Sequence, residues 1–215
     1  MSKVDSKLLV FAKAPVPGAV KTRLQPTLSA TEAAKLQAFF IEHTLSEISS
    51  LEDIDTDLCC FPDETHPVFQ QCAQQYDIRL KKQEGNDLGE RMANALQAAL
   101  AEYRQVVVIG TDCPELTVDY LYEALSRLKQ GPAAVLGPAA DGGYVLFGLQ
   151  MFSPSLFANI TWGTDQVLFQ TRTKLSELGW KWDELHRLRD VDTSEDLLEF
   201  PTLVRDAGLS LKLQV

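Results

Sequence analysis

"VVVIGTDCPELTVDYLYEALSRLKQG", residues 106–131, joins a strand pattern to a helix pattern through a loop with polar side chains. Residues 106–110 are continuously apolar, which is typical of a parallel strand covered on both faces. Residues 117–131 have helical periodicity and finish at Gly131, a common residue just past the end of a helix. The stretch therefore predicts a strand–loop–helix unit, with Asp112 in the loop where the strand ends.

The alternation of strand and helix patterns extends in both directions along the chain. We expect strands at 8–12, 56–61, 78–83, 133–138 and 143–149, and helices at 29–51, 66–76, 87–103, 164–179 and from Thr193 onward. Ser29 and Glu32 stand at the spacing of a capping box where the first helix begins. Because no repeat or linker interrupts the pattern, the sequence predicts a single domain over 1–215. Its fold class is α/β, a three-layer α/β/α arrangement around a mostly parallel sheet.

Loops with polar or charged residues follow several of these strands. In open parallel sheets, ligands bind where the loops after the carboxyl ends of the strands meet. Four loops are therefore expected at one shared edge: "AKAPVPGAVKTRL" (12–24), "GTDCPEL" (110–116), "PAADGG" (138–143) and "RDVDTSED" (189–196).

The first loop combines two prolines and Gly18 with three cations, Lys13, Lys21 and Arg23. It has neither the Gly-Lys pair of a Walker A loop nor a G-x-G-x-x-G pattern. Lysine supplies a point charge and arginine a planar fork, and both suit phosphate oxygens. The alternative is a solvated connection. If the loop binds phosphate, alanine at Lys21 or Arg23 should weaken nucleotide binding and leave the melting temperature nearly unchanged.

Carboxylates mark two of the other loops. Asp112 at a strand end suits a hard divalent cation, although aspartate is also common in turns. Asp190 and Asp192 stand at alternate positions, so both side chains fall on one side if the segment is extended. A capping arrangement at Thr193 and Asp196 explains the residues that follow, and it leaves Asp190 and Asp192 unexplained.

Two further segments offer candidate ligand contacts. Asp141 precedes Gly142 and Gly143, whose backbone can approach a ligand closely, and Asp-Gly is also a strong hairpin signal. We expect a turn whose backbone also faces the ligand. In "GNDLGERM", Glu90 and Arg91 open a helix, where they either contact substrate or simply belong to a capped amphipathic helix.

Composition narrows the classes of function. Lys and Arg number 20 against 30 Asp and Glu, a net charge of -10, which argues against general nucleic-acid binding. The four cysteines form no C-x-x-C pair and the three histidines stand far apart, so a zinc site is not expected. The apolar run before Lys13 is too short for a signal or membrane segment. We expect a soluble, cytoplasmic protein whose reduced cysteines are not catalytic.

Taken together and in order, five motifs resemble a known family: "KAPVPGAVKTRL", "DLGERM", "GTDCPEL", "GPAADGGYVLFGL" and "DVDTSEDL". The chain is similar, over roughly 8–198, to a bacterial glycosyltransferase-like family with the GT-A nucleotide-diphospho-sugar transferase fold. Members of this family are associated with arsenosugar biosynthesis. More distantly, the "KTRL", "DGG" and "DVDT" segments resemble phospholactate and molybdenum-cofactor guanylyltransferases.

The resemblance implies a transferase that binds a nucleotide through its phosphates and a divalent metal, Mg²⁺ or Mn²⁺. It assigns Lys13, Lys21 and Arg23 to phosphate. It assigns Asp112 and Asp192 to the metal. Asp141, Gly142 and Gly143 fall on the substrate side. Gly18, Glu90 and Arg91 complete the expected substrate contacts.

The main hypothesis is glycosyl transfer from a nucleotide-diphosphate sugar to a small-molecule acceptor. A nucleotidyltransferase that releases pyrophosphate and a non-catalytic nucleotide-binding module remain as alternatives. For the general base, Asp141 is the best placed by sequence, and Glu90 and Asp190 stay open.

Overall fold

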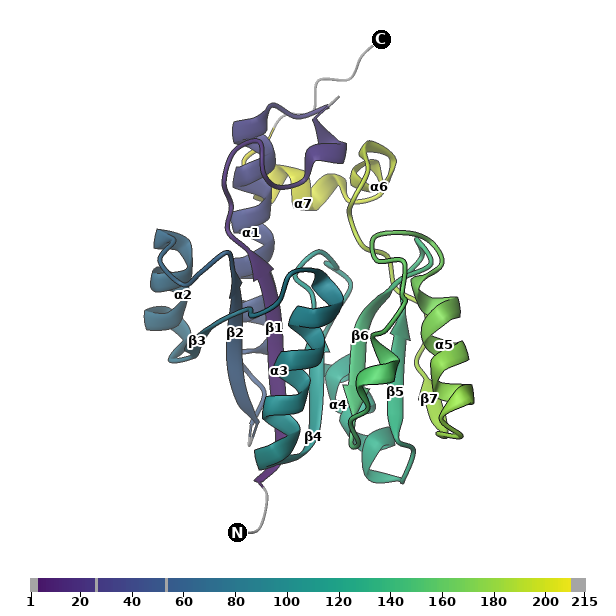
Figure 1. Cartoon of the computed structure of the whole chain (residues 1–215). Helices are drawn as coiled ribbons and strands as arrows, with labels where there is room; N and C mark the ends of the chain where they lie inside the picture. The colour runs from purple at the N-terminus through teal and green to yellow at the C-terminus, as the bar shows by residue number, and fades with distance from the viewer. Residues whose placement is uncertain (1–3, 26, 53, 210–215) are drawn as a thin grey trace.

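One seven-stranded sheet runs through the protein (Figure 1). A computed structural model describes residues 4–25, 27–52 and 54–209. The strands lie in the order β3-β2-β1-β4-β6-β5-β7. β6 is antiparallel to its neighbours β4 and β5, and the other pairs are parallel. The strand bounds are β1 Val4–Lys13, β2 Asp55–Phe61, β3 Arg79–Lys82, β4 Tyr103–Ile109, β5 Ala134–Pro138, β6 Tyr144–Leu149 and β7 Trp182–Glu184. The predicted α/β class with a mostly parallel sheet is confirmed.

Helices cover both faces of the sheet. Because side chains alternate along each strand, successive residues pack into the cores on opposite faces. On one face, Leu8 and Val10 of β1 pack in a core cluster with residues of α1, α2 and α4. On the other face, Leu9 packs with residues of α3 and α5. The helix bounds are α1 Ala30–Ile48, α2 Pro67–Tyr76, α3 Leu88–Glu102, α4 Val118–Lys129, α5 Val167–Glu177, α6 Ser194–Leu198 and α7 Pro201–Asp206. No helix in the described ranges is long and apolar enough to span a membrane.

The predicted boundaries hold closely in the first half of the chain and less well at its end. The capping box at α1 is present, since Ser29 N donates to Glu32 Oε2 at 2.8 Å and Glu32 N to Ser29 Oγ at 3.3 Å. The single helix expected from Thr193 is two helices, α6 and α7. Pro201 stands at the start of α7, where its fixed φ and missing N–H suit a first turn and not a helix interior.

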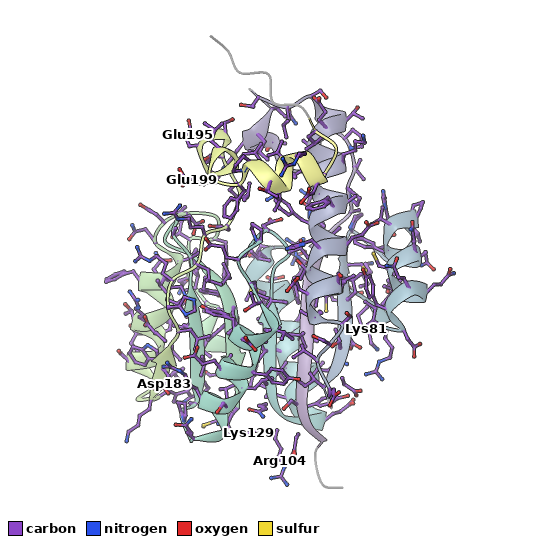
Figure 2. All side chains as sticks on the ribbon, turned by 180° about the vertical axis from the view of Figure 1, so that it is seen from behind. Lys81, Arg104, Lys129, Asp183, Glu195 and Glu199 are labelled. Atoms are coloured by element: carbon purple, nitrogen blue, oxygen red, sulfur yellow. The ribbon has the colours of Figure 1, made fainter. Side chains whose placement is uncertain are left out.

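The four polar loops meet at one edge of the sheet, as predicted. β1, β4 and β5 all point toward this edge, which is the end of the molecule where Glu195 and Glu199 lie in Figure 2, opposite Arg104 and Lys129. The segment before α6 runs across these strand ends. Leu188 N donates to Pro138 O at 3.0 Å and Val191 N to Asp112 O at 2.9 Å. These bonds fix the "RDVDTSED" loop beside the "GTDCPEL" and "PAADGG" loops.

Candidate active site

Lys21 lies at the edge of the sheet where the four polar loops meet, and it joins two loops that are far apart in sequence. Its Nζ is 3.0 Å from Asp112 Oδ1 and 3.2 Å from Asp192 Oδ1, and it donates to the Val191 carbonyl at 2.5 Å. Asp112 and Asp192 therefore converge on one positive charge, and that charge is the Lys21 ammonium.

The side chain of Lys21 is buried, with 3% of its surface exposed. Its backbone has φ 49°, in the left-handed region that non-glycine residues rarely adopt and that is often associated with functional sites. Burial lowers its pKa, but Asp112 and Asp192 outweigh this effect and hold the pKa above its ordinary value. In this arrangement Lys21 is an internal counter-ion. Its burial argues against the expectation that replacing Lys21 would leave stability nearly unchanged. Because Lys21 also lines a cavity, its contact with a bound phosphate stays a prediction.

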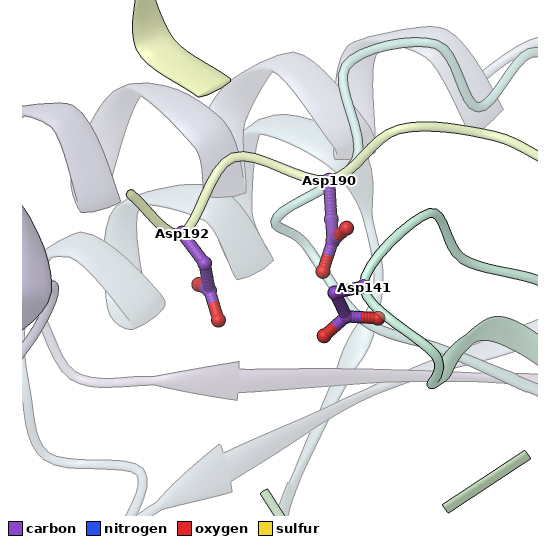
Figure 3. Close-up of side chains that lie close together, drawn as sticks. All are labelled: Asp141, Asp190 and Asp192. Carbon is purple, nitrogen blue, oxygen red and sulfur yellow. The ribbon is translucent and has the colours of Figure 1, made fainter. Parts of the chain in front are cut away.

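Asp192 also belongs to a group of three carboxylates. Asp141, Asp190 and Asp192 each offer an oxygen within 4.8 Å of the others, and Figure 3 shows their side chains pointing into the same space. Burial, with help from the charges of Asp141 and Asp192, raises the pKa of Asp190 to about 7. Such a shift is typical of a carboxyl group that is buried and has other carboxylates beside it.

The donor set of this group fits a hard divalent cation. Three carboxylates from two loops provide oxygen ligands, which Mg²⁺ and Mn²⁺ prefer over nitrogen and sulfur. Asp192 is thus common to the sequence-predicted metal pair and to the observed group. Asp112 does not belong to this group of three, and it is connected to Asp192 through Lys21, whose Nζ contacts both carboxylates.

A cavity of about 500 Å³ is lined by four cations, Lys21 among them, and also by the carboxylates of Asp112 and Asp192. Lys13, Arg23 and Arg91 all contribute to its walls, and their contact with a bound substrate stays a prediction. The Arg23 side chain is 62% exposed, and its nearest carboxylate oxygen, on Asp192, is 3.8 Å away. The Arg91 guanidinium stacks 4.1 Å from the Phe61 ring centre. Its Nε is buried without a hydrogen-bond partner among the described residues. We call this space the basic cavity.

Gln83 also lines the basic cavity, and sequence reasoning did not single it out. Its Nε2 donates to the Ala12 carbonyl at 3.2 Å and to the Cys59 carbonyl at 2.7 Å. Because both amide hydrogens are used in this way, the side-chain oxygen is what Gln83 offers as an acceptor. The available signal was its position as the last residue of the strand predicted over 78–83.

A second cavity, of about 200 Å³, opens on the other side of Phe11, Leu88 and Gly110, which line both spaces. Asp141 and Asp190 lie in its wall, and the rest of its lining is mostly apolar and aromatic. No lysine or arginine lines it within the described ranges. We call it the acidic cavity.

Glycines allow the walls of the acidic cavity to come together. A Cβ on Gly89 of α3 would lie 2.2 Å from Trp162 Nε1, so only glycine lets this helix approach the Trp162 ring. Gly142 has φ +91°, and a Cβ there would lie 2.4 Å from the Asp165 carbonyl oxygen. Gly143 N donates to Asp141 Oδ1 at 2.7 Å and fixes that carboxylate in the turn. The predicted turn is therefore present, and the expectation that its backbone also faces a ligand stays a prediction.

Two sequence candidates, Glu90 and Gly18, lie away from the cavities, and Cys113, which was not a candidate, is buried. Glu90 lines neither cavity, and its carboxylate accepts from Asn86 N at 2.9 Å, which stabilises the loop before α3. A Cβ on Gly18 would meet open space, so its φ of +80° rather than a close approach explains the glycine. Cys113 is buried beside Asp112, and burial raises the pKa of its thiol to about 12.

Comparison with known proteins places the chain in a family. Uncharacterized proteins conserved in bacteria, grouped as DUF2064, match it over residues 44–164. The chain belongs to the DUF2064 family. The crystal structure of a presumed nucleotide-diphospho-sugar transferase from Desulfovibrio desulfuricans G20 is 31% identical, with a TM-score of 0.80. The match covers 94% of this DUF2064 chain and 97% of the other, and it supports a transferase.

Other solved structures share the fold of this DUF2064 protein at low identity. A CMP:2-keto-3-deoxy-manno-octonic acid synthetase complexed with CTP is 9% identical with a TM-score of 0.59, covering 94% of this chain and 99% of that one. The 4-diphosphocytidyl-2C-methyl-D-erythritol synthase from Anaerococcus prevotii DSM 20548 is 12% identical with a TM-score of 0.58, covering 94% and 98%. No curated protein matches the chain.

Proposed function

We propose that this DUF2064 protein transfers a glycosyl group from a nucleotide-diphosphate sugar to a hydroxyl of a small acceptor. The observation that carries the proposal is the contrast between two adjoining cavities, one lined by Lys13, Arg23 and Arg91 and the other by Asp141 and Asp190. A nucleotide-diphosphate sugar has the same polarity, an anionic diphosphate joined to an uncharged sugar. Nucleotidyl transfer to a phosphate or carboxylate would instead bring an anion into the acidic cavity.

The chain's own residues would act on both ends of the reaction. Asp141, with Asp190 beside it, accepts the proton of the acceptor hydroxyl as its oxygen attacks the anomeric carbon of the sugar. The bond from that carbon to the diphosphate breaks, and the nucleoside diphosphate leaves. Arg23 and Lys13 stabilise the negative charge that develops on its phosphate oxygens. We expect Asp141→Asn to lower kcat by about 10²-fold or more, with smaller effects on donor binding.

The proposed cofactor is Mg²⁺ or Mn²⁺, which Asp190 and Asp192 would hold while Asp141 stays available as the base. Asp112, which the sequence paired with Asp192 as a metal ligand, contacts Lys21 instead. When bound, the cation would add positive charge beside the diphosphate. Electron paramagnetic resonance of added Mn²⁺ measures this binding without turnover. We expect a bound Mn²⁺ signal that strengthens when a nucleotide diphosphate is added and is lost in Asp192→Asn. An unchanged Mn²⁺ signal in Asp192→Asn would mean that this group of carboxylates does not bind the cation.

Product analysis separates the proposal from its alternatives. The protein is incubated with nucleotide-diphosphate sugars or with nucleoside triphosphates, in the presence of a small-molecule extract of bacterial cells as acceptor source. Phosphorus nuclear magnetic resonance then identifies the phosphate products. Nucleoside diphosphate released from the sugar donors supports glycosyl transfer, and pyrophosphate released from triphosphates supports nucleotidyl transfer. Binding of both without either product supports a non-catalytic module.

A further inference from the structure

A third cavity, of about 280 Å³, lies on the flank of the sheet, between α3 and the strands β1, β2 and β3. Lys7, Asp57 and Cys59 line it from the strands, and Ala95, Ala98 and Ala99 line it from the helix. It shares no lining residue with the basic or the acidic cavity. We call it the flank cavity.

Lys7 is the charged group at the floor of the flank cavity. Only 2% of its side chain is exposed, and its Nζ lies 2.7 Å from Asp57 Oδ1 and 5.4 Å from the Tyr103 ring centre. No hydrogen bond of good geometry is formed by Nζ within the described ranges. An ammonium has three N–H donors, so one carboxylate oxygen leaves at least two of them without an acceptor. Burying such donors costs free energy unless something in the cavity accepts from them.

The need to neutralise Asp57 does not by itself explain why the Lys7 ammonium is buried. The same oxygen, Asp57 Oδ1, also accepts from Arg79 Nε at 3.0 Å. Arg79 therefore neutralises Asp57 as well, and its Nη2 also lies 3.4 Å from Asp55 Oδ2, whereas Asp57 is the ion-pair partner of Lys7 within the described ranges.

The rest of the lining indicates the chemistry of an occupant. Four cations, Lys7, Arg79, Lys81 and Lys82, face three acids, Asp57, Glu84 and Glu102, in a chain whose net charge is -10. Lys81 lies at the β3 edge of the sheet, where Figure 2 shows it pointing outward. Between the charges, the side chains of Leu9, Cys59 and the three alanines form an apolar surface. This combination suits a molecule with one negative charge on an apolar body.

We propose that the flank cavity is a second ligand site, which binds a small organic monocarboxylate. The carboxylate accepts from the free donors of Lys7, and the apolar body lies against Cys59 and Ala98. The site is separate from the proposed transferase site, although α3 borders both: its first turn carries Leu88 and Arg91 of the basic cavity, and its later turns wall the flank cavity.

Titration with benzoate and hexanoate, followed by ¹H–¹⁵N nuclear magnetic resonance, tests the proposal. Benzamide is the uncharged control ligand. We expect benzoate or hexanoate to bind with a Kd of about 1 mM or below, with amide shifts concentrated at Leu9, Cys59 and Ala98. Benzamide should bind at least about tenfold more weakly, because its uncharged carbonyl can accept from Lys7 but cannot form an ion pair with it.

Two variants remove the site by different means. Lys7→Met removes the charge and should weaken carboxylate binding by about tenfold or more, while Arg79 still pairs with Asp57. Ala98→Leu fills the cavity from the exposed side of a helix that tolerates leucine well, and should abolish binding. Lys129→Met, on the exposed end of α4, is the control and should bind as the wild type does. No shift with either carboxylate at about 10 mM, or equal binding by wild type and Ala98→Leu, would overturn the proposal.

Discussion

Lys21→Met tests the role of the buried ammonium at the centre of the candidate site. Methionine keeps most of the side-chain volume and removes the charge, so Asp112 and Asp192 are left facing each other without a counter-ion. Removing one partner of a buried ion pair costs about 3–5 kcal/mol. The two carboxylates are 42% and 37% exposed, so water compensates part of this loss. We therefore expect the free energy of unfolding to fall by about 2 kcal/mol.

Urea denaturation measures this change. With a slope of about 2 kcal/mol per molar urea, the midpoint of Lys21→Met should fall by about 1 M. Lys129→Met, a matched loss of one exposed lysine, should stay within about 0.5 kcal/mol of wild type.

A double variant identifies the cause. Adding Asp192→Asn to Lys21→Met removes one of the two repelling carboxylates and should restore part of the lost stability. The reasoning is refuted if Lys21→Met unfolds at the same midpoint as Lys129→Met, or if the double variant is less stable by the full sum of the single changes.

Three further predictions follow from the geometry. Arg23→Ala should weaken the binding of a nucleoside diphosphate by about tenfold in calorimetry and leave the urea midpoint unchanged, because this side chain is 62% exposed; equal affinity would remove it from phosphate binding. Gly89→Ala should lower the stability and shift the fluorescence of Trp162, whose Nε1 lies 2.2 Å from the added Cβ position; an unchanged spectrum would contradict this contact. All four thiols are free and buried, and burial raises the pKa of Cys113 to about 12, so iodoacetamide at pH 7.5 should alkylate them only after unfolding. Rapid alkylation of the folded protein would be evidence against this burial.

The sequence was sufficient to predict the sheet edge because the relevant signals are local. An apolar run such as 106–110 marks a buried strand, and parallel strands bring their following loops together. The convergence of Asp112 and Asp192 on one charge follows from this topology, although 80 residues separate them (192 − 112). The hairpin at Asp141 was equally readable from its two glycines.

The identity of the shared charge could not be predicted in the same way. Lys21 and Arg23 are neighbours in one loop and have the same sign, yet Lys21 is buried and Arg23 is exposed. Lys21 has a left-handed backbone, and its side chain donates to the Val191 carbonyl. That orientation is a property of tertiary packing. Gln83 was missed for a similar reason, since its contacts are with the backbones of two other strands.

The most direct test of the proposed function is a calorimetric comparison of donor classes on the same protein. UDP-, GDP- and dTDP-linked sugars are titrated with Mg²⁺ into wild type and Arg23→Ala, and the matching nucleoside triphosphates are titrated in parallel. The account predicts that at least one nucleotide-diphosphate sugar binds more tightly than its triphosphate and loses about tenfold in affinity in Arg23→Ala. Triphosphates that bind more tightly than every sugar nucleotide, or no binding of either class, would contradict it.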